Sequence, residues 1–187
     1  MILKIFIFGD KLVGKTCILK SYLEGEFIEI NDGTFVLDDR RKKVKMEDGK
    51  TVTIQFWDTP GVDRFPNITK KFYKDSHGIL LIYDVTSKYS FDNLEGRIES
   101  IKKEILKPIP IYLVGNKIDI AERRVITKEQ GEEFAKNNGP PPFECTPKEI
   151  ETVNLIFEKL IKNIYENLNP PKDIHKIKHK RKDCSIY

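Results

Sequence analysis

The sequence predicts an α/β fold in which helices cover both faces of a mainly parallel β-sheet. Short apolar runs alternate with stretches of helical periodicity along the chain, a pattern typical of parallel sheets. Two of these runs flank Asp48-Gly49, a hairpin signal that predicts one antiparallel pair at an edge of the sheet. The 187 residues, with ordinary Gly and Pro contents, fit one domain and exclude a disordered or collagen-like chain.

The strands are predicted from apolar runs of strand length. The first covers residues 3–8, where four consecutive apolar side chains from Ile5 indicate a strand that is buried on both faces. The two hairpin strands are predicted at 44–47 and 51–57, and later strands at 79–83 and 111–114.

Four helices are predicted, at 15–24, 91–106, 127–136 and 150–168. The last is the clearest, because its apolar residues recur at steps of three and four and form one face. This face indicates packing on a sheet, and the alternative is a membrane-surface or partner helix. Pro170-Pro171 ends the helix. The residues of the face are Ile150, Val153, Phe157, Leu160, Ile161, Ile164 and Leu168.

The net charge of +4 is confined to the C-terminal end of the chain. Six of the 33 basic residues but only two of the 29 acidic residues lie in 169–187, which leaves 27 of each sign in 1–168. A neutral body argues against a nucleic-acid-binding domain. The sequence instead predicts one domain over 1–168 and a flexible polybasic tail over 169–187.

The cysteines and the hydropathy favour a soluble, intracellular protein. Cys17, Cys145 and Cys184 are too few and too scattered for a disulfide framework or a zinc site. No run approaches the roughly 20 apolar residues of a membrane-spanning helix. The apolar start is too short for a signal peptide, so any contact with membrane is expected through the tail.

Residues 9–16 match the phosphate-binding pattern G-x-x-x-x-G-K-[ST], between the first strand and the first helix. Glycine lets backbone N–H groups approach phosphate oxygens, and the helix N-terminus favours anions. Lys15 is expected to neutralise the β- and γ-phosphates, and the Thr16 hydroxyl to bind Mg²⁺. The alternative is a plain strand-to-helix turn. The predicted nucleotide-binding residues here are Gly9, Lys11, Leu12, Val13, Gly14, Lys15, Thr16 and Cys17.

A second carboxylate site follows in Trp57-Asp58-Thr59-Pro60-Gly61. Asp58 ends a strand and is predicted to hold Mg²⁺ through water, and the Gly61 N–H is predicted to sense a γ-phosphate. This short pattern is weak alone, but together with the phosphate loop it indicates a nucleotide switch.

A base-reading site is predicted in Asn116-Lys117-Ile118-Asp119. The Asp119 carboxylate can accept hydrogen bonds from both N1–H and N2–H of guanine, whereas adenine offers no such pair of donors. A buried carboxylate that the wrong base leaves unpaired gives strong discrimination. The site therefore argues against a P-loop kinase or ATPase. The alternative to a base-reading site is a loop with ordinary polar residues.

With these motifs, residues 3–168 resemble the Ras superfamily of small GTPases, and most of all its Rab family. The resemblance implies the P-loop NTPase (small G-protein) fold with a six-stranded sheet. It also implies that Thr34 contacts Mg²⁺ and the γ-phosphate, that Phe27 packs against guanine, and that Thr146, Pro147 and Lys148 form a second base-binding loop. The Rab-like segments are Trp57-Asp58-Thr59, Arg64-Phe65, Phe72-Tyr73-Lys74, His77-Gly78 and Tyr83-Asp84-Val85-Thr86.

The resemblance implies a monomeric switch of vesicle and membrane traffic that binds GTP or GDP with Mg²⁺ and hydrolyses GTP. Its implied partners are an exchange factor, a GTPase-activating protein and effectors, contacted through the two switch segments and through Trp57 and Phe72. Asp39 stands where the family has a switch I phenylalanine, which predicts a different set of effectors if Trp57 is exposed. The alternative role of Trp57 is core packing.

The chain departs from the family in its catalytic residues, which by resemblance are Lys15, Thr34, Gly61 and position 62. Val62 replaces the glutamine that orients the attacking water, so slow intrinsic hydrolysis is expected. Pro60 stiffens the same segment, and Lys11 replaces a small residue. Three features would offset the loss of the water-orienting glutamine. They are an activating protein that supplies a glutamine in trans, the positive charge of Lys11, and the carboxylate of Asp63. The alternative function is a hydrolysis-deficient, GTP-bound scaffold that acts as a constitutive binding module.

The chain ends in Cys184-Ser185-Ile186-Tyr187, which has the C-a-a-X shape of a prenylation signal. A lipid on Cys184 and the basic residues before it would supply the two signals that stable attachment to an anionic membrane requires. The expected location is the cytosolic face of an intracellular or plasma membrane. The alternative is a nuclear-import or RNA-binding tail.

Overall fold

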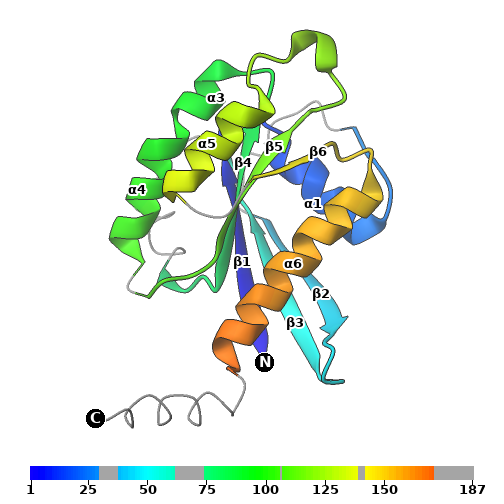
Figure 1. Ribbon diagram of the computed structural model, residues 1–187. Coiled ribbons are helices and arrows are strands. Elements are labelled where there is room, and N and C mark those ends of the chain that lie inside the picture. The colour runs from blue at the N-terminus through cyan, green and yellow to red at the C-terminus, as the bar shows by residue number, and fades with distance from the viewer. Residues whose placement is uncertain (30–37, 62–73, 106, 139–141, 171–187) are drawn as a thin grey trace, which may run out of the picture.

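The computed structural model describes residues 1–29, 38–61, 74–105, 107–138 and 142–170 (Figure 1). Within them lies a six-stranded sheet of order β2-β3-β1-β4-β5-β6. Neighbouring strands are parallel except β2 and β3, which form the predicted antiparallel pair at one edge. The strands are β1 (Ile2–Gly9), β2 (Asp38–Lys45), β3 (Thr51–Asp58), β4 (Gly78–Asp84), β5 (Ile111–Asn116) and β6 (Phe143–Cys145).

Helices cover both faces of the sheet, as predicted (Figure 1). One face packs against α1 (Lys15–Glu24) and α6 (Ile150–Leu168), and the other against α3 (Lys88–Asp92), α4 (Leu94–Glu104) and α5 (Lys128–Asn138). Because β4 lies between these two layers, it is buried along its whole length. Its nearly continuous apolar sequence follows from that position.

The core beneath α1 and α6 is centred on three aromatic rings. Tyr22 and Phe157 stack with their centroids 4.2 Å apart, and the Phe56 ring stands edge-on to both. A fully buried side chain of this kind contributes on the order of 1.5–3 kcal/mol to folding. The three rings join α1, α6 and β3 in one core.

The predicted helix at 91–106 is wrong in extent, because the chain forms two helices there. α3 begins at Lys88, where the Ser87 hydroxyl accepts a hydrogen bond from the Ser90 N–H at 3.3 Å. The two helices are separated at Asn93. A serine cap, rather than an apolar period, marks this start in the sequence.

The first hairpin strand is longer than predicted, because β2 begins at Asp38 rather than at residue 44. Its side chains are largely exposed basic residues, which give no apolar signal. The strand ends at Lys45, and Gly49 closes the turn with φ 83° and an N–H bonded to the Met46 carbonyl at 2.9 Å. β6 and a 3-10 turn at Ala121–Arg123 also lie outside the predicted elements.

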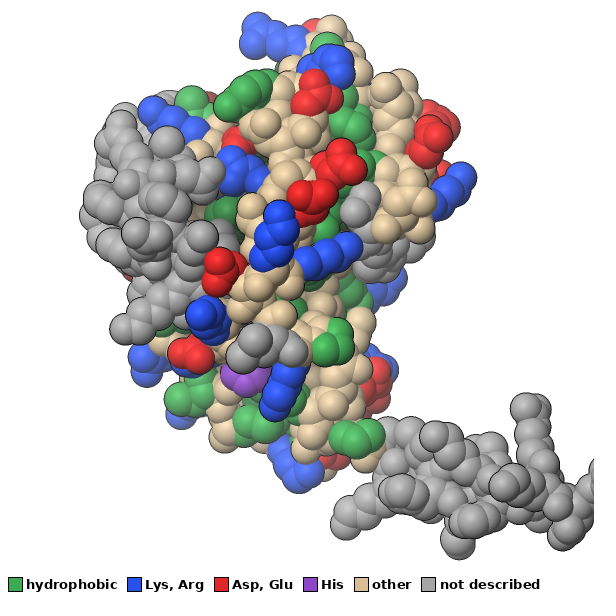
Figure 2. All heavy atoms as spheres, turned by 90° about the vertical axis from the view of Figure 1, so that its left-hand side faces the viewer, with side chains coloured by type: hydrophobic (Ala, Val, Ile, Leu, Met, Phe, Trp, Pro, Cys, Tyr) green, Lys and Arg blue, Asp and Glu red, His purple; other side chains and the backbone are tan. Residues whose placement is uncertain are grey.

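The outer sides of α4 and α5 carry basic and acidic side chains side by side, and Figure 2 shows the two signs intermixed over this face. Lys103 pairs with Glu99 at 3.9 Å and Lys128 with Glu132 at 4.0 Å, each across one helical turn. Among the described helices, none is both long and apolar enough to cross a membrane.

Candidate functional site

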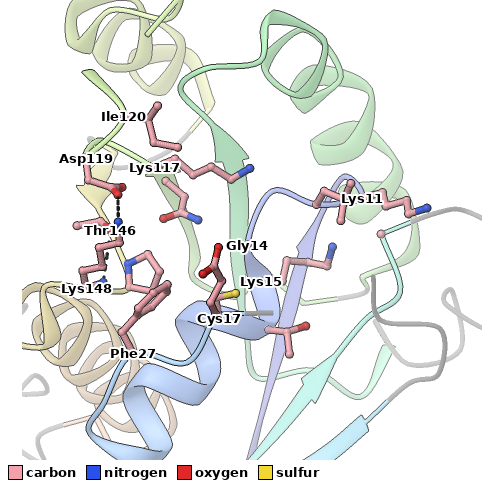
Figure 3. A pocket seen from close by; sticks show the side chains of 16 residues that line it. Lys11, Gly14, Lys15, Cys17, Phe27, Lys117, Asp119, Ile120, Thr146 and Lys148 are labelled. Atoms are coloured by element: carbon pink, nitrogen blue, oxygen red, sulfur yellow. Dashed lines mark hydrogen bonds and ion pairs between the residues drawn. The ribbon is translucent and has the colours of Figure 1, made fainter. Parts of the chain in front are cut away.

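A pocket of about 360 Å³ opens where β1 and β5 end, within the usual size range of small-molecule sites (Figure 3). Most of its lining residues are predicted ones, and they come from five separate parts of the chain. Glu29 and Ile120 line it without having been predicted. The predicted lining residues are Lys11, Leu12, Gly14, Lys15, Thr16, Cys17, Phe27, Gly61, Asn116, Lys117, Asp119, Thr146, Pro147 and Lys148.

The phosphate loop is shaped by two glycines that leave no room for a side chain. Gly14 lies at the N-terminus of α1 with φ 96°, and a Cβ there would lie 2.2 Å from Asn116 Nδ2. Gly9 has φ 148°, and its Cβ would lie 2.2 Å from the Ile82 carbonyl oxygen. The loop therefore turns tightly enough for backbone N–H groups to face an anion at the helix N-terminus.

The Lys15 ammonium lies inside this loop, and only 5% of the residue is exposed. Its Nζ donates hydrogen bonds to the carbonyl oxygens of Gly9 at 3.1 Å and Asp10 at 2.8 Å. Burial lowers the pKa of Lys15 to about 8, although attraction to Asp58 opposes the shift. A phosphate anion would therefore add to the charge compensation that Asp58 gives this buried cation.

The Thr16 hydroxyl donates a hydrogen bond to Oδ2 of Asp58, so the two predicted Mg²⁺-binding residues meet. Oδ1 of Asp58 is buried and has no hydrogen-bond partner among the described residues. Burial raises the pKa of Asp58, against the opposing effects of Thr16 and Lys15. A hydroxyl beside a carboxylate with a spare buried oxygen is a donor set that fits Mg²⁺ and its bound water.

Asn116 joins the base-reading segment to the phosphate loop. Its Nδ2 donates to the Val13 carbonyl at 2.7 Å, which is why Val13 supports the pocket without lining it. Lys117 adopts the left-handed conformation with φ 68°, and its Nζ pairs with Asp84 at 2.6 Å. The two ends of the pocket are therefore held at a fixed separation.

Asp119 and Lys148 close the far end of the pocket, where Figure 3 shows their side chains meeting. Lys148 Nζ lies 2.7 Å from Asp119 Oδ2 and 5.6 Å from the centre of the Phe27 ring. Burial acts to raise the pKa of Asp119, but hydrogen bonds from Lys148 and Thr146 outweigh it and hold that pKa below its usual value. The carboxylate is therefore ionised and can accept hydrogen bonds.

Gly61 places the end of the β3 segment directly against the phosphate loop. A Cβ at this position would lie 2.3 Å from the Lys11 Cα and 2.6 Å from the Asp10 carbonyl oxygen. Lys11 itself points away from the Asp119 end of the pocket (Figure 3). No larger residue than glycine fits at this contact.

Trp57 is half-buried and packs against the core beneath α3, α4 and α5. The core contact confirms the packing alternative, and the partly exposed side chain leaves the effector-contact role a prediction. Asp39 lies opposite Trp57 in the hairpin register, and its carboxylate accepts hydrogen bonds from Gln55 at 2.8 Å and Arg41 at 3.1 Å. A fixed negative charge thus stands beside the tryptophan.

Several predicted residues lie outside the described residues. They are Thr34 in the first switch segment, Val62 and Phe72 in the second, and Cys184 in the tail. The predictions for these four positions remain predictions.

Comparison with known proteins finds similarity along most of the chain. The Ras family model matches residues 4–166. "Ras-related protein Rab-26" of Homo sapiens is 40% identical over 164 residues, which are 86% of this chain and 63% of that protein. "Ras-related protein Rab-37" of Homo sapiens is 38% identical over 164 residues, 86% of this chain and 72% of that protein. "Ras-related protein SEC4" of Candida albicans is 37% identical over 166 residues, 89% of this chain and 79% of that protein.

Proposed function

The chain belongs to the Ras family of small GTPases and is most like its Rab members, and on this premise we propose that it is a guanine-nucleotide switch of membrane traffic. In this proposal it binds GTP or GDP with Mg²⁺ and hydrolyses GTP slowly. The observation that carries the proposal is that phosphate-binding Lys15 and base-reading Asp119 line one pocket.

Guanine is recognised at the Asp119 end of the pocket. The ionised carboxylate accepts the N1–H and N2–H of the base, and the partly exposed Phe27 ring packs against its face. The ion pair with Lys148 fixes the carboxylate before the base arrives. Because adenine cannot donate this pair of hydrogen bonds, an adenine nucleotide would leave the carboxylate without its partners.

The phosphates lie along the loop at the other end. Lys15 and the N-terminus of α1 attract the β- and γ-phosphates. Thr16 and Asp58 are the residues that would hold Mg²⁺, directly and through water respectively. When bound, this ion neutralises charge on the phosphate oxygens. Gly61 lies against the same loop, and its N–H would report the presence of a γ-phosphate.

Slow hydrolysis follows from the residue at position 62. Valine neither donates nor accepts a hydrogen bond, so it cannot orient an attacking water as the family's glutamine does. By resemblance Thr34 assists at the γ-phosphate. An activating protein that brings its own glutamine and arginine would restore the rate in trans.

The test is to identify the nucleotide in freshly purified protein and to follow single-turnover hydrolysis of GTP. Slow hydrolysis, accelerated by Val62→Gln, is the expected result. A Val62→Gln variant that hydrolyses GTP no faster than wild type would contradict the proposed effect of the missing glutamine. Bound ATP in place of a guanine nucleotide would overturn the proposed base specificity.

A GTP-bound scaffold that scarcely hydrolyses its nucleotide is the second candidate. Val62 favours it, and so does Lys11, whose positive charge stands where an activating protein's arginine approaches in the family. Purified protein loaded with GTP supports the scaffold, and protein loaded with GDP supports the switch.

Partners and location follow from the family and from the tail. An exchange factor, an activating protein and effectors would contact the switch segments, Trp57 and Phe72, and the Asp39 charge beside Trp57 would select the effectors.

A prenyl group on Cys184 and the basic tail would hold the protein on the cytosolic face of an anionic membrane. Mass spectrometry of protein from its own cells tests this, and an unmodified Cys184 would contradict the anchor.

A further inference from the structure

A buried ion pair joins the phosphate loop to a helix that contributes nothing to the lining of the nucleotide pocket. Asp10, the second residue of the loop, pairs through Oδ1 with the Arg97 guanidinium of α4. The other carboxylate oxygen, Oδ2, accepts a hydrogen bond from Asn93 Nδ2 at 2.8 Å. The Arg97 and Asp10 side chains are only 14% and 9% exposed. Both oxygens of one buried carboxylate are therefore held, by Arg97 of α4 and by Asn93 at its N-cap.

Asn93 makes this contact instead of capping its own helix. It stands at the N-cap of α4, where asparagine usually accepts a hydrogen bond from the first turn. Its side chain makes no such bond and reaches the phosphate loop, 83 residues away. Arg97 also lies over the Phe8 ring, 5.1 Å from its centre, and so contacts the end of β1 as well.

The backbone of Asp10 connects this contact to the nucleotide site. Its carbonyl oxygen accepts the hydrogen bond from Lys15 Nζ at 2.8 Å. The same carbonyl oxygen lies against Gly61, where a Cβ would come within 2.6 Å of it. A shift of the Asp10 side chain would therefore move Lys15 and Gly61, the two residues proposed to meet the terminal phosphates.

We propose that Arg97 and Asn93 are positioning residues that hold the Asp10 carbonyl, and through it Lys15, in the geometry required for a second phosphate group. The ligand class is a guanosine di- or triphosphate, so the inference rests on the proposed function. Removing one partner of a buried pair leaves the other charge uncompensated, which disturbs the loop more than loss of an exposed pair.

The test compares GDP with GMP, which lacks the phosphate that Lys15 meets. Nucleotide-free full-length protein is titrated with fluorescent GDP and GMP in Mg²⁺. Arg97→Gln is expected to weaken GDP binding about tenfold, in the usual range for coupled neighbours, and to leave GMP binding within about twofold. Arg97→Lys should recover part of the loss. Lys103→Gln, which removes an exposed pair from the same helix, is the matched control.

The ratio of the two affinities separates positioning from mere stability. A general loss of folded protein would weaken GDP and GMP equally, and that result would overturn the proposal. If Arg97→Gln does not fold, the Asp10→Asn/Arg97→Gln variant removes both charges together. This variant must still lower the ratio of GDP affinity to GMP affinity. Wild-type protein that binds no GDP contradicts the proposed function and this inference with it. Wild type that binds GDP while the variants match Lys103→Gln contradicts this inference alone.

Discussion

In the proposed function, the choice of base depends on Asp119. Its carboxylate can accept two hydrogen bonds from guanine, whereas an asparagine amide accepts one and donates one. Asp119→Asn is therefore expected to weaken GDP binding by at least about a hundredfold, since a polar site that loses its matched partner discriminates strongly. The same variant should gain affinity for xanthosine diphosphate, which carries an acceptor at C2.

Titration of nucleotide-free protein with both nucleotides checks this prediction. Glu122→Gln is the control, because Glu122 is an exposed carboxylate in the neighbouring 3-10 turn. GDP binding that Asp119→Asn leaves unchanged would show that another group reads the base.

His77 makes the stability of the sheet depend on pH. Its Nδ1 accepts a hydrogen bond from the Lys4 backbone N–H at 3.0 Å. Burial lowers the pKa of His77 below its usual value, and the Lys4 charge lowers it further while Asp75 opposes the shift. As pH falls, the unfolded chain takes up this proton before the folded chain does. The free energy of unfolding therefore decreases as pH drops through about 6.5 toward the folded pKa.

His77→Asn tests this contribution, because the amide oxygen can accept the same N–H but does not titrate. Between about pH 7.5 and pH 5.5, wild type should lose more stability in urea unfolding than His77→Asn does. Parallel losses in the two proteins would show that His77 is not the titrating group.

At the scale of elements, the contact of α6 with β4 depends on a missing side chain. A Cβ at Gly78 would lie 2.4 Å from Ile164 Cδ1 and 3.3 Å from Leu160 Cδ1. Gly78→Ala is therefore expected to lower the free energy of unfolding by about 1–3 kcal/mol. Ile164→Val removes the clashing Cδ1, so the double variant should lose less than the sum of the single variants. Urea unfolding measures all three, and losses that simply add would contradict this close approach.

Two helix glycines are expected to respond to alanine in opposite directions. Gly96 in α4 has nothing within 4 Å of a Cβ, so Gly96→Ala should stabilise the protein by about 0.5–1 kcal/mol. At Gly131 in α5 a Cβ would lie 2.8 Å from the Tyr83 hydroxyl, so Gly131→Ala should destabilise it. Thermal unfolding of both variants checks this prediction. Equal shifts of the two melting temperatures would contradict the packing of α5 on β4.

The elements that the sequence predicts well are those with strong apolar periodicity. α6 is confirmed from Ile150 to Leu168 because its apolar face recurs at every turn. β2 and the start of α3 differ from the prediction for the opposite reason. The exposed basic strand carries no alternation, and α3 starts at a hydrogen bond from the Ser90 N–H to Ser87 that hydropathy does not reveal.

At the scale of the whole molecule, the nucleotide pocket could be predicted because its motifs are local. The phosphate loop and the base-reading segment each follow a strand, and parallel strands bring their carboxyl ends to one edge of the sheet. The Asp10 pair with Arg97 could not be predicted, since 87 residues separate the partners and nothing local marks them. Glu29 and Ile120 likewise belong to no motif, and they line the pocket only because the folded chain passes beside it.

The most direct test of the account is whether this pocket selects guanine over adenine nucleotides. Calorimetric titration of nucleotide-free protein with GDP and with ADP, both in Mg²⁺, measures the two affinities under one condition. GDP is expected to bind at least about a hundredfold more tightly, because ADP offers Asp119 no pair of donors. Equal affinities, or tighter binding of ADP, would contradict the account.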